Sequence, residues 1–190
     1  LKARDRAWVL SSWQVIVDEY PVMGTEIKIT TAAYEFKGFM GMRNFIIETT
    51  DGKRLAWANS NWTHLVISTG LPARLTPADT DNYVLSEKME MDYAPRKIKL
   101  PDSMIPQESF AVQKHHLDTN HHVNNCQYIC MAEDFLPEDF KVYQMRAEYK
   151  MQAKLGDTIC PKTMTEAGKV VVSLNDENGK PYAVVEFTEK

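Results

Sequence analysis

The side chains best suited to proton transfer are gathered in residues 118–125, which read Asp-Thr-Asn-His-His-Val-Asn-Asn. This short stretch holds one carboxylate, three carboxamides and two imidazoles. An imidazole has a reference pKa of about 6.5, so it can accept or release a proton near neutral pH. Carboxamides can orient a water molecule or a polar substrate beside it. The stretch is therefore the first candidate for acid–base chemistry.

A strand is expected before this stretch and a helix after it. Residues 109–113 alternate apolar and polar side chains, which is the period of a half-buried strand. Asn124 or Asn125 can cap a helix that stops before Pro137. We expect this helix to cover about residues 124–135. Unpaired backbone N–H groups and the positive end of the helix dipole would then face the polar side chains.

Composition and charge argue against several classes of protein. The net charge of −4 disfavours nucleic acid or an anionic membrane surface as the main partner. No apolar run of about 18 residues occurs, so no transmembrane helix is expected. Cys126, Cys130 and Cys160 form no CxxC pair and leave one cysteine over in any disulfide scheme, which favours a reducing cytoplasm. The sequence opens on Leu1 without a signal peptide, and we expect the natural N-terminus to lie upstream.

Long strands dominate the rest of the chain. β-branched and aromatic residues alternate along them, and turn signals such as Asp51-Gly52 and Asn178-Gly179 separate them. The proline-rich, charged residues 71–108 are expected to form a linker, with a short helix or turn at 76–82. The expected strands cover residues 8–18, 25–36, 43–50 and 53–68 before the linker, and residues 142–153, 158–165, 169–175 and 180–188 after it.

The two strand-rich parts look like one unit used twice, with residues 1–70 as the first unit and residues 109–190 as the second. A helix is expected before the long strand of the second unit, whereas only a few residues precede the first strand of the first unit. Long antiparallel strands wrapped around a central helix make a hot-dog fold, so the sequence predicts an α+β double hot dog. We expect the first unit to lack its N-terminal strand and helix.

The central stretch resembles a motif of the acyl-acyl carrier protein thioesterases of plants and bacteria. The motif is D-x-N-x-H-V-N-N-x-x-Y, which is present here from Asp118 to Tyr128. Supporting similarities extend over nearly all of the chain, at Trp8-Val9-Leu10, Arg43-Asn44-Phe45, Ser60-Asn61-Trp62 and Gly156-Asp157. The resemblance implies hydrolysis of fatty acyl thioesters, which terminates fatty acid synthesis, with no cofactor and no metal. It also implies an acyl carrier protein as partner, and a monomer or homodimer.

Thioester hydrolysis needs an activated water, a proton donor for the leaving thiolate and a partner for the developing oxyanion. His122 is the candidate base. In an extended chain Asp118, Asn120 and His122 share one face and can hold one water molecule. The resemblance implies that these three residues are catalytic. The candidates for the oxyanion hole are the backbone N–H groups at the expected helix start, in Val123, Asn124 and Asn125.

One position departs from the family pattern. The plant members carry glutamate followed by cysteine on the strand after the helix, where this chain has Gln152 and Ala153. A carboxamide can orient a water molecule but cannot accept its proton as a carboxylate does. We therefore expect neither a glutamate base nor a cysteine nucleophile here. We expect Gln152 to position the lytic water while His122 or Asp118 acts as base.

Acyl carrier proteins are acidic, so the resemblance predicts local positive charge on this acidic chain. The candidate carrier-binding residues are Arg96, Lys97, Lys99, Lys150 and Lys154, although a run of charges is usually only a solvated face.

Other interpretations stay open at this stage. The protein could be an acyl-CoA thioesterase, or a non-catalytic acyl-binding or carrier-docking module, which Gln152 makes plausible. The polar residues of the motif could form a structural turn network without catalysis. The pairs His115-His116 and His121-His122 suggest a metal, but neighbouring residues of a strand point to opposite faces and no Cys or Glu ligand stands at a recognised spacing.

Overall fold

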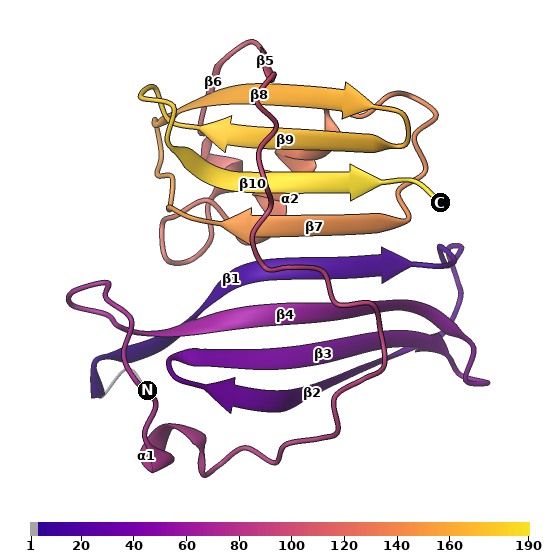
Figure 1. The fold of residues 1–190 in the computed structure, drawn as a ribbon, viewed down its shortest axis with the longest axis vertical. Coiled ribbons are helices and arrows are strands. Elements are labelled where there is room, and N and C mark those ends of the chain that lie inside the picture. Colours follow the sequence, from indigo (N-terminus) through magenta and orange to yellow (C-terminus); the bar gives the residue numbers. More distant parts are fainter. Residues whose placement is uncertain (1–3) are drawn as a thin grey trace. The chain divides into compact units, whose positions relative to one another are not determined.

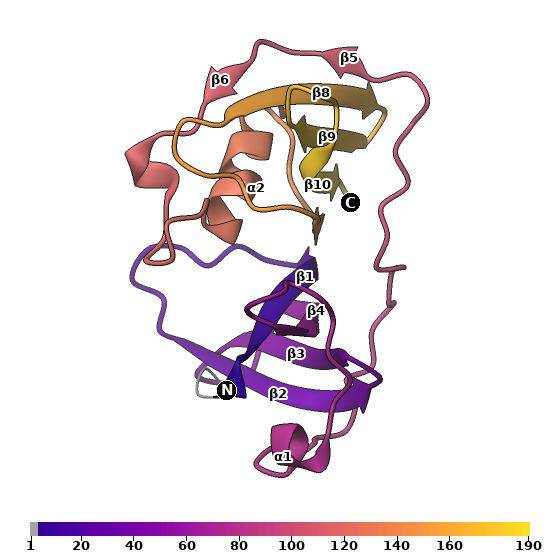
Figure 2. The ribbon, with the colours of Figure 1, turned by 90° about the vertical axis from the view of Figure 1, so that its left-hand side faces the viewer.

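The structure, a computed structural model, describes residues 4–190 and divides into two compact units. Unit 1 ends at Arg96 and unit 2 begins at Lys97. Each unit contains an antiparallel sheet, shown in Figures 1 and 2. The segment 71–108, expected to be a linker, is divided between the units at this boundary.

Unit 1 is a four-stranded antiparallel sheet. β-branched and aromatic side chains, which suit a pleated and half-buried surface, recur along all four strands. The β2–β3 hairpin turns at Gly38, which has a φ of 67°. Glycine adopts this conformation without steric cost. The strands are β1 (Arg6–Val17), β2 (Ile27–Lys37), β3 (Met40–Thr49) and β4 (Arg54–Val66), in the spatial order β2-β3-β4-β1. The four strands predicted for this part of the chain are confirmed.

A short helix, α1 (Pro77–Thr80), follows the sheet of unit 1. The Asp79 carboxylate accepts hydrogen bonds from the backbone nitrogen of Thr76 at 3.0 Å and from its hydroxyl at 2.6 Å. Proline suits the first helical position because its missing N–H is not needed there. The helix or turn predicted at 76–82 is therefore confirmed, and it is held by its own first residues.

Residues 81–96 then cover one face of the unit 1 sheet. Asn44 Oδ1 on β3 accepts a hydrogen bond from the Tyr93 hydroxyl at 3.1 Å. Gln14 Oε1 on β1 accepts one from the Ala94 amide at 2.9 Å. The opposite face of the sheet keeps apolar side chains partly in solvent: Ile29 is 64% exposed. Unit 1 thus has one covered face and one partly open apolar face.

Unit 2 is a second antiparallel sheet in the order β7-β10-β9-β8-β5, with β6 also pairing with β8. Its elements along the chain are β5 (Ile105–Pro106), β6 (Phe110–Ala111), a 3-10 helix (Lys114–His116), α2 (Asn125–Glu133), β7 (Gln144–Tyr149), β8 (Thr158–Glu166), β9 (Lys169–Asn175) and β10 (Pro181–Thr188). Figure 2 shows α2 beside the sheet, and it lies against β9 and β10.

Both faces of the unit 2 sheet are covered. Residues directly opposite one another on β9 and β10 are 0% exposed, for example the pairs Val172–Val185 and Val170–Phe187. On the outer face Ile98 packs with Met164, Val171 and Val184. Ile98 belongs to the segment that crosses in front of the strands in Figure 1. Apolar residues on both sides explain why β9 and β10 read as nearly continuous hydrophobic runs.

Two predicted strands of unit 2 have the wrong length. The strand expected at 142–153 is only β7, because the amides of Lys150 and Met151 both donate to the Tyr182 carbonyl and so break the regular ladder with β10. The strand expected at 109–113 is only β6, because Gln113 already begins the 3-10 helix. Among residues 4–190, no helix is long and apolar enough to cross a membrane.

Candidate active site

The polar stretch of unit 2 is a tight turn, so its predicted extended conformation is wrong. Leu117 and Val123 pair as an isolated antiparallel bridge, and the Asp118 amide donates to the His122 carbonyl at 2.9 Å. His121 closes the turn with a φ of 61°, in the left-handed region that histidine visits more readily than bulky apolar residues do. The turn brings residues 118 and 122 together by folding the chain back on itself.

The Asp118 carboxylate is the hydrogen-bond acceptor of this turn. Its Oδ1 accepts the Asn120 amide at 2.8 Å and the His122 amide at 3.3 Å, and its Oδ2 accepts the Asn120 side-chain amide at 3.2 Å. Burial pushes the pKa of Asp118 upward, but these hydrogen bonds outweigh it and the pKa lies below its usual range. The three predicted site residues are therefore brought together around an ionised carboxylate.

α2 begins directly after the turn. Asn124 is its N-cap, and the Asn124 side-chain oxygen accepts the Cys126 amide at 2.9 Å, which decides between the two predicted caps. The Val123 amide donates to the Ala153 carbonyl and the Asn124 amide to the His116 carbonyl, both at 2.9 Å. These two N–H groups are committed to the fold and do not point at a substrate. Of the three predicted oxyanion donors, the Asn125 amide has no acceptor among the described residues.

The segment after β7 lies beside the turn. Ala153 is 0% exposed, and its carbonyl receives the Val123 amide while its own amide donates to the Tyr128 hydroxyl at 2.8 Å. Gln152 is exposed, and it lies next in the chain to a residue that is bonded to the motif. A side chain at position 153 points into the core, whereas one at position 152 reaches solvent. Of these two residues, only Gln152 has a side chain accessible to solvent.

His116, which the sequence analysis considered only as a metal ligand, makes a hydrogen bond across the 3-10 helix before the turn. His116 Nδ1 accepts the Gln113 amide at 2.9 Å, so His116 is neutral in this arrangement. Its ring lies 4.1 Å from the ring of His115, centroid to centroid. Burial, followed by the neighbouring His115, lowers the pKa of His116. Within residues 4–190, no group of three or more metal-ligating side chains is found.

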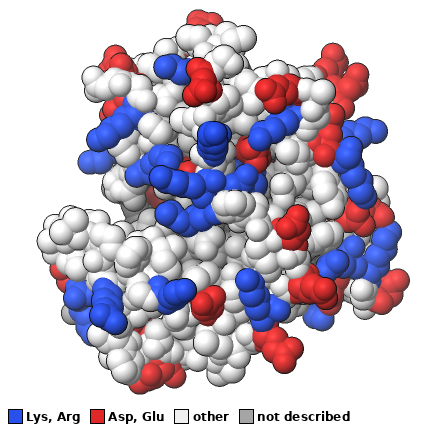
Figure 3. All heavy atoms as spheres, viewed as in Figure 1, with Lys and Arg blue, Asp and Glu red and all other residues white. Residues whose placement is uncertain are grey.

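Basic side chains lie over two buried carboxylates on the outer face of the unit 2 sheet. Glu148 and Glu186 are 3% and 6% exposed. Lys150 Nζ lies 3.0 Å from Glu148, while Arg146 and Lys169 lie 2.7 and 2.6 Å from the two oxygens of Glu186. Figure 3 shows Lys and Arg side chains gathered over this part of unit 2. The carboxylates lie beneath and the cations outside.

The structure brings together only some of the predicted carrier-binding residues. Lys97 and Lys99 are exposed on either side of the buried Ile98, so they lie on the same outer face as Lys150. Arg146 and Lys169 join this group, which we call the basic face: Lys97, Lys99, Arg146, Lys150 and Lys169. Sequence analysis missed Arg146 and Lys169, because only strand pairing brings them to one surface. Arg96 belongs to unit 1, and exposed Lys154 lies in the segment after β7.

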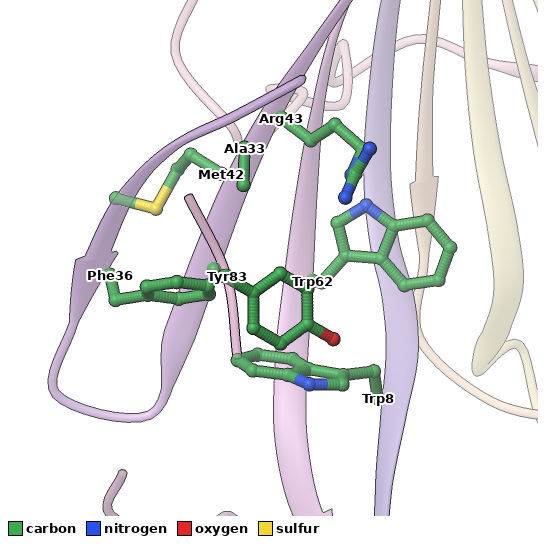
Figure 4. A pocket seen from close by; sticks show the side chains of 8 residues that line it. Trp8, Ala33, Phe36, Met42, Arg43, Trp62 and Tyr83 are labelled. Atoms are coloured by element: carbon green, nitrogen blue, oxygen red, sulfur yellow. The ribbon is translucent and has the colours of Figure 1, made fainter. Parts of the chain in front are cut away.

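Unit 1 contains a small apolar pocket with a volume of about 160 Å³. Figure 4 shows the rings of Trp8, Phe36 and Tyr83 around it, with Trp62 and Arg43 along one side. Gly41 is part of the wall, and a Cβ at this position would lie 3.1 Å from ring atoms of Phe36 and Trp8. An apolar lining of this kind is common in sites that bind apolar ligands.

Comparison with known proteins places both units in one family. Residues 1–83 match the acyl-ACP thioesterase N-terminal domain, and residues 99–186 match the C-terminal domain. The chain belongs to the acyl-ACP thioesterase family. The resemblance inferred from the motif is thereby confirmed.

Two curated members of the acyl-ACP thioesterase family match over most of the chain. The acyl-[acyl-carrier-protein] hydrolase FATB1, chloroplastic, of Cuphea viscosissima is 25% identical over 169 residues, covering 82% of this chain and 40% of that protein. The palmitoyl-acyl carrier protein thioesterase, chloroplastic, of Arabidopsis thaliana is 27% identical over 160 residues, covering 76% and 38%. The chain therefore spans about two fifths of the length of these relatives.

Solved structures of acyl-ACP thioesterases share the fold. The enzyme from Bacteroides thetaiotaomicron superposes with a TM-score of 0.89 at 20% identity, over 99% of this chain and 78% of that one. The 12:0-ACP thioesterase from Umbellularia californica gives a TM-score of 0.86 at 18% identity, over 98% and 76%. The predicted α+β hot-dog fold is confirmed by these similarities.

Proposed function

We propose that this protein hydrolyses fatty acyl thioesters carried by acyl carrier protein. The observation that carries the proposal is the turn in which the Asp118 carboxylate binds both Asn120 and His122, at the N-terminus of α2. Membership of the acyl-ACP thioesterase family supports the same reaction. The two curated relatives, an acyl-[acyl-carrier-protein] hydrolase and a palmitoyl-acyl carrier protein thioesterase, agree with this substrate class.

The chemistry follows from the side chains of the turn. His122 takes a proton from a water molecule, whose oxygen attacks the thioester carbonyl carbon, and the imidazolium then gives that proton to the leaving thiolate. The Asn125 amide, at the positive end of α2, stabilises the oxyanion. Asp118 stays ionised and holds the backbone of His122 in place. Gln152 orients the water, since its carboxamide can both donate and accept hydrogen bonds.

The acyl chain would occupy the apolar pocket of unit 1. Aromatic rings and Met42 line it, and these side chains remove alkyl groups from water without requiring hydrogen bonds from them.

The acyl carrier protein would dock on the basic face of unit 2. The buried carboxylates of this face, Glu148 and Glu186, are already paired with Arg146, Lys150 and Lys169. Lys97 and Lys99 extend into solvent. A surface of this kind attracts an acidic partner and raises its association rate. We expect Lys97→Glu combined with Lys99→Glu to raise KM for the carrier substrate but not for a small uncharged thioester. Lys37→Glu on unit 1 is the control, and equal effects on both substrates would contradict the docking site.

Release of free thiol from acyl carrier thioesters tests the reaction. The wild-type protein should turn over a fatty acyl carrier substrate, and His122→Ala should reduce kcat by at least about 100-fold, the lower range for a general base. His121→Ala, in the same turn but with an exposed side chain, is the matched control. The same panel with acyl-CoA substrates separates the two carriers. Thiol release that is equal in wild type and His122→Ala would overturn the proposal, as would tight acyl binding without any release.

A further inference from the structure

A buried tyrosine of α2 links the catalytic turn to the segment that carries Gln152. Tyr128 is 2% exposed, and its hydroxyl accepts the Ala153 amide at 2.8 Å. The Ala153 carbonyl accepts the Val123 amide at 2.9 Å. Ala153 is thus hydrogen-bonded on its N–H side by the helix and on its C=O side by the motif.

This arrangement holds the backbone next to the two side chains that the proposed mechanism places on one water molecule. Gln152 precedes Ala153 and His122 precedes Val123, so each lies one residue from a bonded backbone group. Because the peptide unit is planar, holding the Ala153 amide also orients the Gln152 carbonyl in the same peptide. The Ala153 side chain is buried and that of Gln152 is exposed. The hydrogen bonds therefore direct Gln152 outward beside the turn.

We propose that Tyr128 is a positioning residue for hydrolysis, which holds Gln152 at the place where it and His122 contact the same water. The inference rests on the proposed function, since it concerns the water that attacks the thioester. Tyr128 acts through Ala153 and Gln152 and does not itself touch the reacting atoms.

The chemistry of the buried phenol supports a fixed hydrogen bond rather than proton transfer. Burial raises the pKa of the Tyr128 hydroxyl to about 12, so the group stays protonated throughout the working range of a histidine base. A neutral hydroxyl accepts the Ala153 N–H and keeps its own proton. Removing only this oxygen leaves the ring, which fills the space between α2 and the sheet.

The neighbouring Tyr149 provides a matched control. Its ring centroid lies 6.2 Å from that of Tyr128, and its hydroxyl donates to the Asn125 carbonyl at 3.1 Å. It has no hydrogen bond to residues 151–154 in the described part of the chain. Tyr149→Phe therefore removes a buried phenol oxygen of the same neighbourhood without releasing Ala153.

Amide hydrogen exchange tests the structural link by itself. Tyr128→Phe should speed exchange of the Ala153 amide and shift the NMR signals of the Gln152 side chain, because the amide loses its acceptor. Tyr149→Phe should leave both unchanged. Unchanged exchange at Ala153 in Tyr128→Phe would overturn the inference, whatever the activity of the variant.

Steady-state kinetics tests the consequence. Tyr128→Phe should lower kcat by about 10- to 100-fold, the effect of a small misplacement of a catalytic group, while KM stays within about twofold. Gln152→Ala should then cost much less in the Tyr128→Phe background than in the wild type, because the two changes remove one interaction. In the Tyr149→Phe background, Gln152→Ala should have its full effect. Additive losses for Tyr128→Phe and Gln152→Ala would overturn the inference.

The outcomes separate this inference from the proposed function. A wild-type protein that releases no thiol would overturn the proposed function and, with it, the kinetic role of Tyr128. A hydrolase in which Gln152 and Tyr128 act independently would overturn only the role of Tyr128.

Discussion

Asp118 and His122 are joined by two hydrogen bonds across the turn that precedes α2. The Asp118 amide donates to the His122 carbonyl at 2.9 Å, and the His122 amide donates to Asp118 Oδ1 at 3.3 Å. The carboxylate thus holds the backbone of the proposed base, not its imidazole. This contact gives Asp118 a structural task that can be separated from a catalytic one.

Asp118→Ala should lower the free energy of unfolding by roughly 1–3 kcal/mol, because amides of the turn lose a charged acceptor. Urea denaturation followed by circular dichroism measures this loss. Thr119→Ala is the control, since its exposed side chain makes no hydrogen bond to the described residues of the turn. An unchanged midpoint in Asp118→Ala would show that the carboxylate does not hold the turn.

Asn124→Ala should destabilise the protein by about 1 kcal/mol, the usual effect of removing an N-cap acceptor. The Asn124 side chain accepts the Cys126 amide at 2.9 Å, and alanine leaves this group unpaired in the first turn of α2. Thermal unfolding measures the effect. Asn125→Ala, at the next position, should stay within about 0.5 kcal/mol of the wild type, and equal losses in both variants would argue against Asn124 as the cap.

The stability of the turn should fall as the pH falls below about 6.5, the unfolded pKa of histidine. The pKa of His116 is lowered in the folded state, so the unfolded chain binds more protons and stability is lost as the pH drops through the folded pKa. Protonation of Nδ1 also removes the acceptor of the Gln113 amide. Unfolding free energies between pH 7.5 and about 5 should depend less on pH in His116→Gln, while His121→Gln retains the wild-type slope. Identical slopes in all three proteins would refute this linkage.

Gln152→Glu should extend hydrolysis to lower pH. A carboxylate beside the water can accept its proton, and glutamate has a reference pKa of about 4.3, below that of histidine. The profile of kcat/KM against pH measures the change. Gln152→Ala provides no base and should not gain activity at low pH. A profile of Gln152→Glu that matches the wild type would mean that this position does not contact the water.

Gly41→Val should reduce hydrolysis of long acyl chains more than that of short ones. A Cβ at this position already lies 3.1 Å from ring atoms of Phe36 and Trp8, so the extra methyl groups of valine must displace these rings into the pocket. The ratio of kcat/KM for a long and a short chain should fall by about tenfold, the effect of one or two methylenes in an apolar pocket. A uniform loss for all chain lengths would indicate damage to the sheet instead.

The sequence by itself determined the local parts of this protein. Alternating apolar residues placed the strands of both units, Asn124 or Asn125 marked the start of α2, and the motif from Asp118 to Tyr128 indicated the family. These signals depend on residues close together in the chain, where side-chain period and capping preference act directly.

Only the tertiary structure decided how the site is assembled. The motif folds as a turn rather than a strand, because His121 adopts a positive φ and the Ala153 carbonyl takes the Val123 amide. In the segment after β7, Ala153 is buried and Gln152 is exposed, and no local sequence pattern indicates this difference. Arg146 and Lys169 meet at Glu186 through strand pairing. Hydrogen bonds and ion pairs between residues far apart in sequence leave no periodic trace in it, so they become visible only once the chain is folded.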